Sequence, residues 1–179
     1  AGEKKEKTPE KMEWDMEKVQ KDGYEHYLLK EIMEIPLAIK NTIRGRLLVG
    51  KGRAKLGGVE GVLDQLTSLN RLVLVACGSA AYATQVGKYI IEEYAGLPVD
   101  TELASEYRYK KNIPDKKSAV MAVTQSGETA DTRAAIQLAK EMDLLTLGIV
   151  NVVGSTIARE TDAGVYNHAG PEISIASSK

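Results

Sequence analysis

The stretch Arg71-Leu-Val-Leu-Val-Ala-Cys-Gly78 contains six consecutive apolar residues and ends in a glycine. A strand that is apolar at every position, rather than at alternate positions, is buried on both faces, as in a parallel sheet. Residues 80–94 then follow a helical pattern, and Gly96 comes after its end. One face of that helix carries four apolar side chains: Tyr82, Val86, Tyr89 and Ile90. The stretch therefore predicts the first strand and helix of an α/β domain.

The same alternation continues along the chain. Further strands are expected over residues 98–103, 118–123, 145–153 and 164–167, and further helices over residues 105–109, 129–142 and 155–161. The helix over 129–142 is expected to turn four residues to the core: Ala135, Leu138, Ala139 and Met142. Strands that alternate with helices are joined by right-handed crossovers and form a parallel sheet. The predicted fold is an α/β domain with a doubly wound, mainly parallel sheet flanked by helices.

The part of the chain before this pattern divides into two segments. Residues 1–22 hold six lysines and seven acidic residues and few apolar ones, which predicts a solvated linker. Residues 23–58 are expected to form N-terminal helices and a connecting segment that packs on the domain over residues 59–179. Apolar residues recur at helical spacing there: Tyr24, Tyr27, Leu28, Ile32, Ile35, Ile39, Ile43 and Leu47. Pro36 is expected to break this pattern or to open a second helix.

Composition excludes several classes of protein. The chain has 179 residues, with 24 Lys and Arg against 25 Asp and Glu, and this balance argues against a general nucleic-acid binder. No run of about 18 apolar residues is present, so no membrane span is expected. The single Cys77 rules out an intramolecular disulfide and a cysteine-based zinc site. A reducing cytoplasm is the expected location.

Hydroxyl groups gather where ligands bind in such a sheet, beyond the carboxyl ends of the strands. The three loops rich in hydroxyls span residues 77–80, 124–129 and 175–179. In the second loop, Thr124, Ser126 and Thr129 surround the N-terminus of the expected helix, and Gly127 allows close backbone approach. Hydroxyls and free helix N–H groups suit an anion such as a phosphate. The alternative is structural: Ser126 would only cap the helix and Gly127 would only turn the chain.

Other candidate groups are expected to be structural. Cys77 ends an apolar strand without an evident base, as a buried thiol would. Glu128 is expected to stabilise the start of its own helix and to point away from a bound phosphate. His26 and His168 are far apart in the sequence and lack the neighbouring carboxylates of a metal site.

The second loop, Gln125-Ser-Gly-Glu-Thr-Ala-Asp-Thr132, resembles the signature of the sugar isomerase (SIS) domain, as does its pairing with the earlier Cys-Gly-Ser. The chain is similar, more specifically, to the first SIS subdomain and preceding linker of the glutamine–fructose-6-phosphate aminotransferase family. The supporting segments are Gly23-Tyr-Glu-His-Tyr-Leu-Leu-Lys-Glu-Ile32, Asn41-Thr-Ile-Arg-Gly-Arg46, Ala104-Ser-Glu-Tyr-Arg-Tyr109 and Ala169-Gly-Pro-Glu-Ile-Ser-Ile-Ala-Ser-Ser-Lys179. The resemblance therefore implies an SIS-like fold, truncated at its C-terminal end.

That family converts fructose 6-phosphate and glutamine into glucosamine 6-phosphate and glutamate, without a metal or organic cofactor. The resemblance implies a role in binding the sugar phosphate for seven residues of this chain: Ser79, Thr124, Gln125, Ser126, Thr129, Ile175 and Ser177. The acid–base groups of the family lie in a second SIS subdomain, a C-terminal tail and a neighbouring subunit. No catalytic residue is therefore expected here, and the chain alone is expected to be inactive. The expected partners are fructose 6-phosphate or glucosamine 6-phosphate, the second SIS and glutaminase domains, and a second copy in a homodimer.

One position departs from the family pattern. Ala80 stands where the family commonly has a serine, so one hydroxyl for the phosphate is missing, whereas Thr124 replaces a usual serine but keeps the hydroxyl. The alternative function is a non-catalytic SIS module that senses a phosphosugar in a transcriptional regulator. Such regulators usually carry a DNA-binding helix-turn-helix upstream, and the mixed-charge linker does not match one. A simple ketose–aldose phosphate isomerase would need an acid–base pair that the sequence does not reveal.

Overall fold

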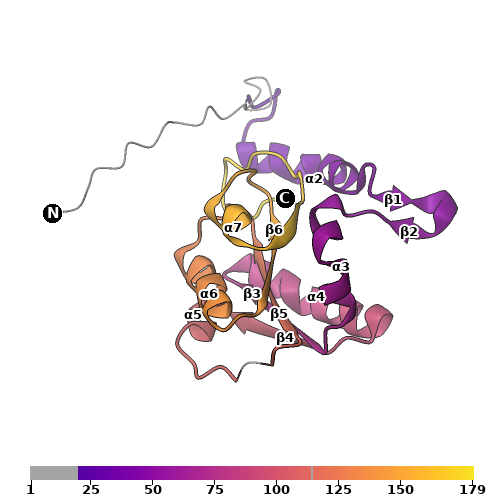
Figure 1. Cartoon of the computed structure of the whole chain (residues 1–179). Coiled ribbons are helices and arrows are strands. Elements are labelled where there is room, and N and C mark those ends of the chain that lie inside the picture. The colour runs from indigo at the N-terminus through magenta and orange to yellow at the C-terminus, as the bar shows by residue number, and fades with distance from the viewer. Residues whose placement is uncertain (1–19, 114) are drawn as a thin grey trace.

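The computed structural model describes residues 20–113 and 115–179, and its centre is a five-stranded parallel sheet (Figure 1). The strand order is β4-β3-β5-β6-β7. The strands span Arg71–Ala76 (β3), Val99–Leu103 (β4), Ser118–Thr124 (β5), Leu145–Val150 (β6) and Ala163–Tyr166 (β7). Every neighbouring pair in this sheet is parallel, which confirms the predicted doubly wound fold.

The order of the strands reverses beside β3. The chain first places β4 on one side of β3 and then returns to place β5 on the other, and β6 and β7 continue outward from β5. Such a reversal leaves a crevice at the carboxyl ends of the two central strands, because their following loops lead to opposite faces of the sheet. The loops after β3 and β5 flank this crevice.

Helices cover both faces of the sheet (Figure 1). Helix α4 (Ser79–Ala95) lies on one face, whereas α5 (Ala104–Tyr107), α6 (Ala130–Glu141) and α7 (Thr156–Glu160) lie on the other. The core on the α6 face includes fully buried Val120, Ala135, Ile136 and Ile157. The expected inward residues of α6 are confirmed, since Ala135 and Ala139 are buried and Leu138 and Met142 pack against this core. A second core on the α4 face joins Leu72, Leu74 and Val99 to α3 (Leu63–Thr67).

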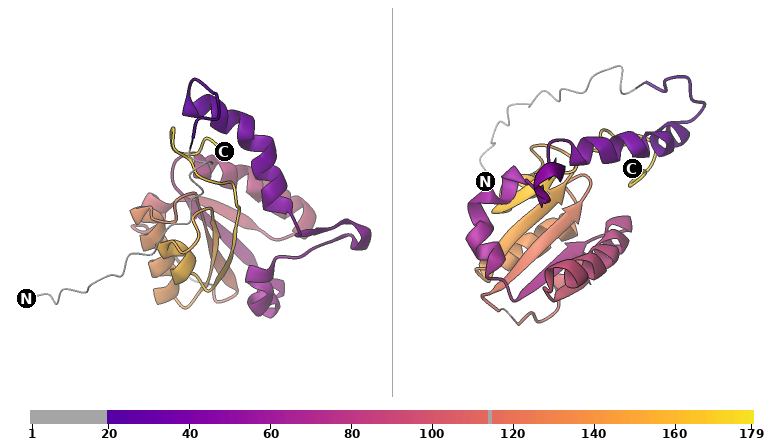
Figure 2. Two further views of the ribbon diagram at one scale, coloured as in Figure 1. Left: turned by 90° about the horizontal axis from the view of Figure 1, so that it is seen from above. Right: turned by 90° about the vertical axis from the view of Figure 1, so that its right-hand side faces the viewer.

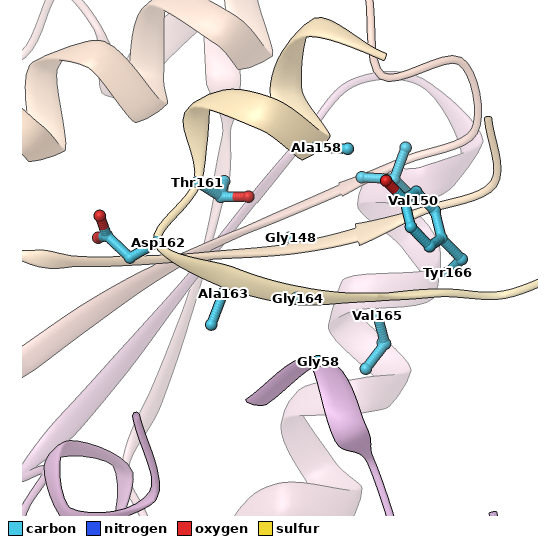
Figure 3. Close-up of a pocket in the computed structure, with 10 residues that line it drawn as sticks. All are labelled: Gly58, Gly148, Val150, Ala158, Thr161, Asp162, Ala163, Gly164, Val165 and Tyr166. Atoms are coloured by element: carbon cyan, nitrogen blue, oxygen red, sulfur yellow. The ribbon is translucent and has the colours of Figure 1, made fainter. Parts of the chain in front are cut away.

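Glycines allow a close backbone approach at the β7 edge of the sheet (Figure 3). The 3-10 segment η2 (Gly57–Val62) crosses β7 so tightly that a Cβ on Gly58 would lie 1.9 Å from the carbonyl oxygen of Gly164. Gly58 and Gly164 also line a hollow of about 220 Å³ with Thr161 and Asp162. The carboxylate of Asp162 already accepts hydrogen bonds from the backbone N–H and the hydroxyl of Thr146, at 2.8 and 2.7 Å. This hollow lies at the β7 edge, and its lining includes none of the residues of the loops after β3 and β5.

Residues 23–56 contain one α-helix where the sequence pattern allows two. Helix α2 runs from Tyr27 to Ile43 with Pro36 inside it, so the expected break at this proline is wrong. A proline lacks one N–H, and the helix continues on the hydrogen bonds of the turns on either side. After α2, the short strands β1 (Leu47–Leu48) and β2 (Arg53–Ala54), joined by the 3-10 turn η1 (Val49–Lys51), form an antiparallel hairpin that projects from the body (Figures 1 and 2).

The apolar faces recognised from spacing on α2 and α4 are exposed. On α4 the exposed residues are Tyr82, Val86, Tyr89 and Ile90, and on α2 they include Leu28, Ile32, Ile39 and Ile43. The residues that α2 buries are Lys30, Glu31 and Ala38. Helix α2 therefore packs through a charged side, contrary to what its hydrophobic spacing indicates. None of the helices in the part of the chain described here is long and apolar enough to cross a bilayer.

Candidate functional site: a hydroxyl-lined crevice at the switch point

The first wall of the crevice is the turn from β3 into α4. Gly78 adopts a positive φ of 59°, a conformation that glycine enters without strain, and α4 starts directly after it at Ser79. Ser79 is exposed and Ala80 is half-buried in the first turn of the helix. The N-terminus of a 17-residue helix therefore faces the end of the sheet with one hydroxyl beside it.

The second wall is the loop from β5 into α6. The buried hydroxyl of Thr124 accepts a hydrogen bond from the N–H of Gly127 at 3.2 Å, and Ser126 Oγ accepts one from the N–H of Glu128 at 3.2 Å. A hydroxyl that accepts a hydrogen bond keeps its own proton to donate. Thr129 is the N-cap of α6, and its side chain makes no capping bond. The hydroxyl of Ser126 therefore caps the N–H of Glu128, one residue before the N-cap of α6, and not an N–H of the helix itself.

The two walls lie side by side. Strand β3 pairs with β5, and Val75 stands opposite Ala122 near their carboxyl ends. A direct contact also joins the walls, since the hydroxyl of the buried Thr132 on α6 donates to Cys77 Sγ at 3.6 Å. The structure thus brings Ser79 together with Thr124, Gln125, Ser126 and Thr129. Cys77 is half-buried against the core, in keeping with the structural role expected for it.

Glu128 caps α7 with its carboxylate, and not its own helix, so the role expected for it at the start of α6 is wrong. Its carboxylate accepts a hydrogen bond from the N–H of Thr156, the first residue of α7, at 2.7 Å. That bond, with a further one from the Thr156 side chain, holds the pKa of Glu128 below its ordinary value. The other acid near the start of α6, Asp131, pairs with Arg108 at 2.8 Å. Both carboxylates are thus occupied, which reduces the repulsion that an anion in the crevice would meet.

The third predicted region, with Ile175 and Ser177, belongs to neither wall of the crevice. Both residues are exposed, on a segment without regular structure that follows β7. Parallel strands end at the same edge of the sheet, so this segment starts beside the crevice, and it runs between that edge and α2 (Figures 1 and 2). Its main anchors are on α2 and on Glu172, whose carboxylate accepts a hydrogen bond from the N–H of Ser177 at 3.0 Å.

Two residues that were not predicted from the sequence, Asn151 and Glu31, connect this segment to the crevice and to α2. The N–H of Asn151 donates to the carbonyl of Gln125 at 3.2 Å, and its side chain bonds Ala169 and Gly170 at 2.8 and 2.7 Å. Glu31 binds the segment from the opposite side. Asn151 directly follows the buried strand β6, and that position could have marked it, whereas nothing in the spacing of α2 distinguishes Glu31.

Comparison with protein families identifies the domain to which most of this chain corresponds. The model of the SIS domain matches residues 65–179, which include both walls of the crevice and the C-terminal segment. This chain belongs to the SIS domain family. The match confirms the resemblance read from the 125–132 signature.

Two of the relatives that match this chain are much longer than it. Glutamine–fructose-6-phosphate aminotransferase from Chlorobaculum tepidum is 48% identical over 94% of this chain, which spans 27% of that relative. The Clostridium acetobutylicum enzyme of the same name is 44% identical over 99% of the chain, which spans 29% of it. The chain thus corresponds to somewhat more than a quarter of these relatives, within their isomerase part.

Solved structures agree. The C-terminal domain of glucosamine-fructose-6-phosphate aminotransferase from Francisella tularensis has a TM-score of 0.83 and 38% identity over 89% of this chain, which covers 44% of that domain. The sugar isomerase domain of an RpiR transcription factor from Sphaerobacter thermophilus has a TM-score of 0.53 at 14% identity. That second likeness shows the shared fold alone, so it does not favour the regulator alternative.

Proposed function

We propose that this SIS domain binds the phosphate of fructose 6-phosphate or glucosamine 6-phosphate in the crevice between β3 and β5, as the first SIS subdomain of a glutamine–fructose-6-phosphate aminotransferase. The observation that carries the proposal is the meeting of two hydroxyl-bearing helix N-termini, those of α4 and α6, at the switch point of the sheet. Ser79, Thr124, Gln125, Ser126 and Thr129 are assigned to the phosphate, and Ile175 and Ser177 to the sugar.

The donors available fit a phosphate monoester of modest affinity. Thr124 and Ser126 use their oxygens as acceptors within the loop, so both keep a hydroxyl proton for a ligand. Hydrogen bonds to a charged group contribute roughly 1.5–3 kcal/mol each, and a helix N-terminus adds about 0.3–1 kcal/mol. After the cost of association, three or four such bonds correspond to a Kd of about 1 mM.

The acid–base steps and the supply of ammonia belong to other domains of the proposed enzyme. The crevice presents donors for an anion, and the nearest acids, Glu128 and Asp131, are held in other contacts. We therefore assign no catalytic residue and no cofactor to this chain, and expect no turnover by it alone. The proposed assembly is a cytoplasmic homodimer in which the second SIS and glutaminase domains supply the acid–base groups and the ammonia.

Isothermal titration calorimetry of the 179-residue chain tests the binding proposal. Fructose 6-phosphate and glucosamine 6-phosphate are expected to bind with a Kd of about 1 mM, inorganic phosphate more weakly, and fructose not measurably. Ser126→Ala should weaken both sugar phosphates by about ten- to a hundredfold. Ser68→Ala, an exposed serine that bonds only its own short helix α3, is the matched control and should bind normally. Failure of the unaltered chain to bind, or equal affinities for all three proteins, would refute the proposal.

A further inference from the structure

Glu31 is nearly completely buried on a helix that is otherwise largely exposed. Its exposed fraction is 2%, whereas apolar neighbours on α2 such as Leu29 and Met33 are 47% and 59% exposed. A buried carboxylate is costly unless hydrogen bonds replace its water. The hydrogen-bond donors to the Glu31 carboxylate therefore show which part of the chain this side of α2 binds.

The carboxylate of Glu31 accepts its hydrogen bonds from one segment, residues 173–178. Its Oε1 accepts from the N–H groups of Ile173 and Ser174, at 2.6 and 3.3 Å. Its Oε2 accepts from the hydroxyl of Ser174 and, at 2.6 Å, from the hydroxyl of Ser178. Burial raises the pKa of Glu31, but these four hydrogen bonds outweigh it, so the pKa lies below the ordinary value. The charged form is therefore the one that the segment recognises.

The segment depends on such contacts for its shape, because it forms neither helix nor strand. Ser177, in its middle, has a positive φ of 63°, which a residue with a Cβ adopts only at an energetic cost. Glu172 holds the N–H groups of Ser177 and Lys179, at 3.0 and 2.9 Å. At the end of the segment, Lys179 Nζ pairs with Glu34 of α2 at 2.6 Å. One turn of α2, from Glu31 to Glu34, thus holds one face of the segment while Ile175 and Ser177 remain exposed.

We propose that Glu31 is a positioning residue: by binding residues 173–178 from α2, it fixes the conformation in which Ile175 and Ser177 meet the sugar of a bound sugar phosphate. The proposal rests on the proposed function, because it takes the sugar to lie between this segment and the crevice. The carboxylate of Glu31 is held by Ile173, Ser174 and Ser178, so its proposed effect on the ligand passes through the segment. The phosphate loops after β3 and β5 have other supports, namely the β3–β5 pairing and the contacts of Asn151 and Thr132.

This difference in supports separates a positioning role from general stabilisation. Glu31→Gln keeps the size of the side chain but removes its negative charge, so the hydrogen bonds with residues 173–178 are no longer charge-assisted and become weaker. We expect Glu31→Gln to weaken fructose 6-phosphate by about tenfold or more, while inorganic phosphate, which needs only the two loops, binds as before. Glu25→Gln, an exposed carboxylate just before α2, is the matched control and should leave both affinities unchanged.

Amide hydrogen exchange supplies a readout independent of any ligand. The N–H groups of Ile173 and Ser174 should exchange faster in Glu31→Gln than in the unaltered chain, while those of β5 and α6 should not change. If Glu31→Gln does not fold, Ser174→Ala, which removes one hydroxyl contact and keeps the carboxylate, should give the same selective loss in smaller measure.

The outcomes distinguish this inference from the proposed function. No binding of fructose 6-phosphate or phosphate by the unaltered chain overturns the proposed function and this inference with it. A second result is that the unaltered chain binds both ligands normally while Glu31→Gln loses affinity for both equally, or for neither. Either form of this result overturns only the positioning role. A selective loss for the sugar phosphate, with faster exchange at residues 173 and 174, supports it.

Discussion

Gly127 lies directly against Ser155: a Cβ at position 127 would come within 2.0 Å of Ser155 Oγ. Gly127 also has a positive φ of 68°, and its carbonyl accepts the N–H of Ile157 at 2.9 Å. The loop that forms one wall of the crevice is therefore packed against the start of α7 with no room for a side chain. The conformational freedom and the small size of this glycine are both required.

Gly127→Ala should therefore destabilise the domain. The clash and the left-handed backbone together are expected to lower the free energy of unfolding by about 2–4 kcal/mol, measured by urea denaturation. The double variant Gly127→Ala with Ser155→Gly removes the two nearest clashing atoms, leaves Val150 Cγ1 at 2.9 Å, and should recover part of this loss. Gly57→Ala is the control, since it has an ordinary φ and no atom within 4 Å of a new Cβ. Equal effects at positions 127 and 57 would contradict the packing argument.

Ala80→Ser should strengthen phosphate binding. Ala80 lies in the first turn of α4, next to Ser79, so a serine there would add a hydroxyl donor at the mouth of the crevice. One added hydrogen bond to a charged group corresponds to roughly 1.5–3 kcal/mol, or about a tenfold or larger decrease in the Kd of fructose 6-phosphate. Calorimetric titration of the two proteins side by side measures the change. Identical dissociation constants would show that position 80 does not face the phosphate.

Removing the side chain of Glu128 should destabilise α7 without changing the phosphate site directly. Its carboxylate caps the N–H of Thr156 at 2.7 Å, and loss of such a cap costs about 1 kcal/mol. Glu128→Ala is therefore expected to lower the free energy of unfolding by about that amount and to keep the affinity for inorganic phosphate within about twofold. A large loss of phosphate affinity would instead place Glu128 in the binding site.

The stability of the domain should depend on the charge of Glu31 in acid. Its pKa is lowered in the folded state, so its contribution is complete above the ordinary value of 4.5 and is lost as the pH falls from there through the folded-state pKa. Urea denaturation of the unaltered chain and of Glu31→Gln measures the difference. The difference in free energy of unfolding between the two proteins should be constant near neutral pH and should decrease below the ordinary pKa of 4.5. A constant difference into strong acid would show that the charge of Glu31 does not contribute.

The sheet and the crevice were largely predictable from the sequence, for a physical reason. The strands that carry the two loops, β3 and β5, are mostly apolar, which is typical of strands buried on both faces of a parallel sheet. Once the sheet is parallel, the loops after both strands lie at the same edge. The order of the strands, which makes these loops neighbours, is a property of long-range pairing that local patterns do not record.

Helix α2 shows where local patterns give the wrong answer. Hydrophobic spacing marks Leu28 and Ile32 as its inner face, yet both are exposed, and Glu31 is buried. A carboxylate is buried here because several donors of a segment more than 140 residues away converge on it. Pro36 also gives the wrong expectation, since it predicts a break but the hydrogen bonds of the flanking turns let the helix continue through it. Neither fact can be read from the residues near α2.

The contact between Glu31 and Ser178 joins residues 147 positions apart. Long-range contacts form late, because closing a long loop costs entropy before the contact repays it. When the chain is synthesised from its N-terminus, α2 emerges early but must wait for residues 173–178, after all five sheet strands have been made. Docking of α2 on this segment therefore cannot precede the synthesis of the sheet strands, and the support that it gives to Ile175 and Ser177 comes only after the loops that follow β3 and β5 have been made.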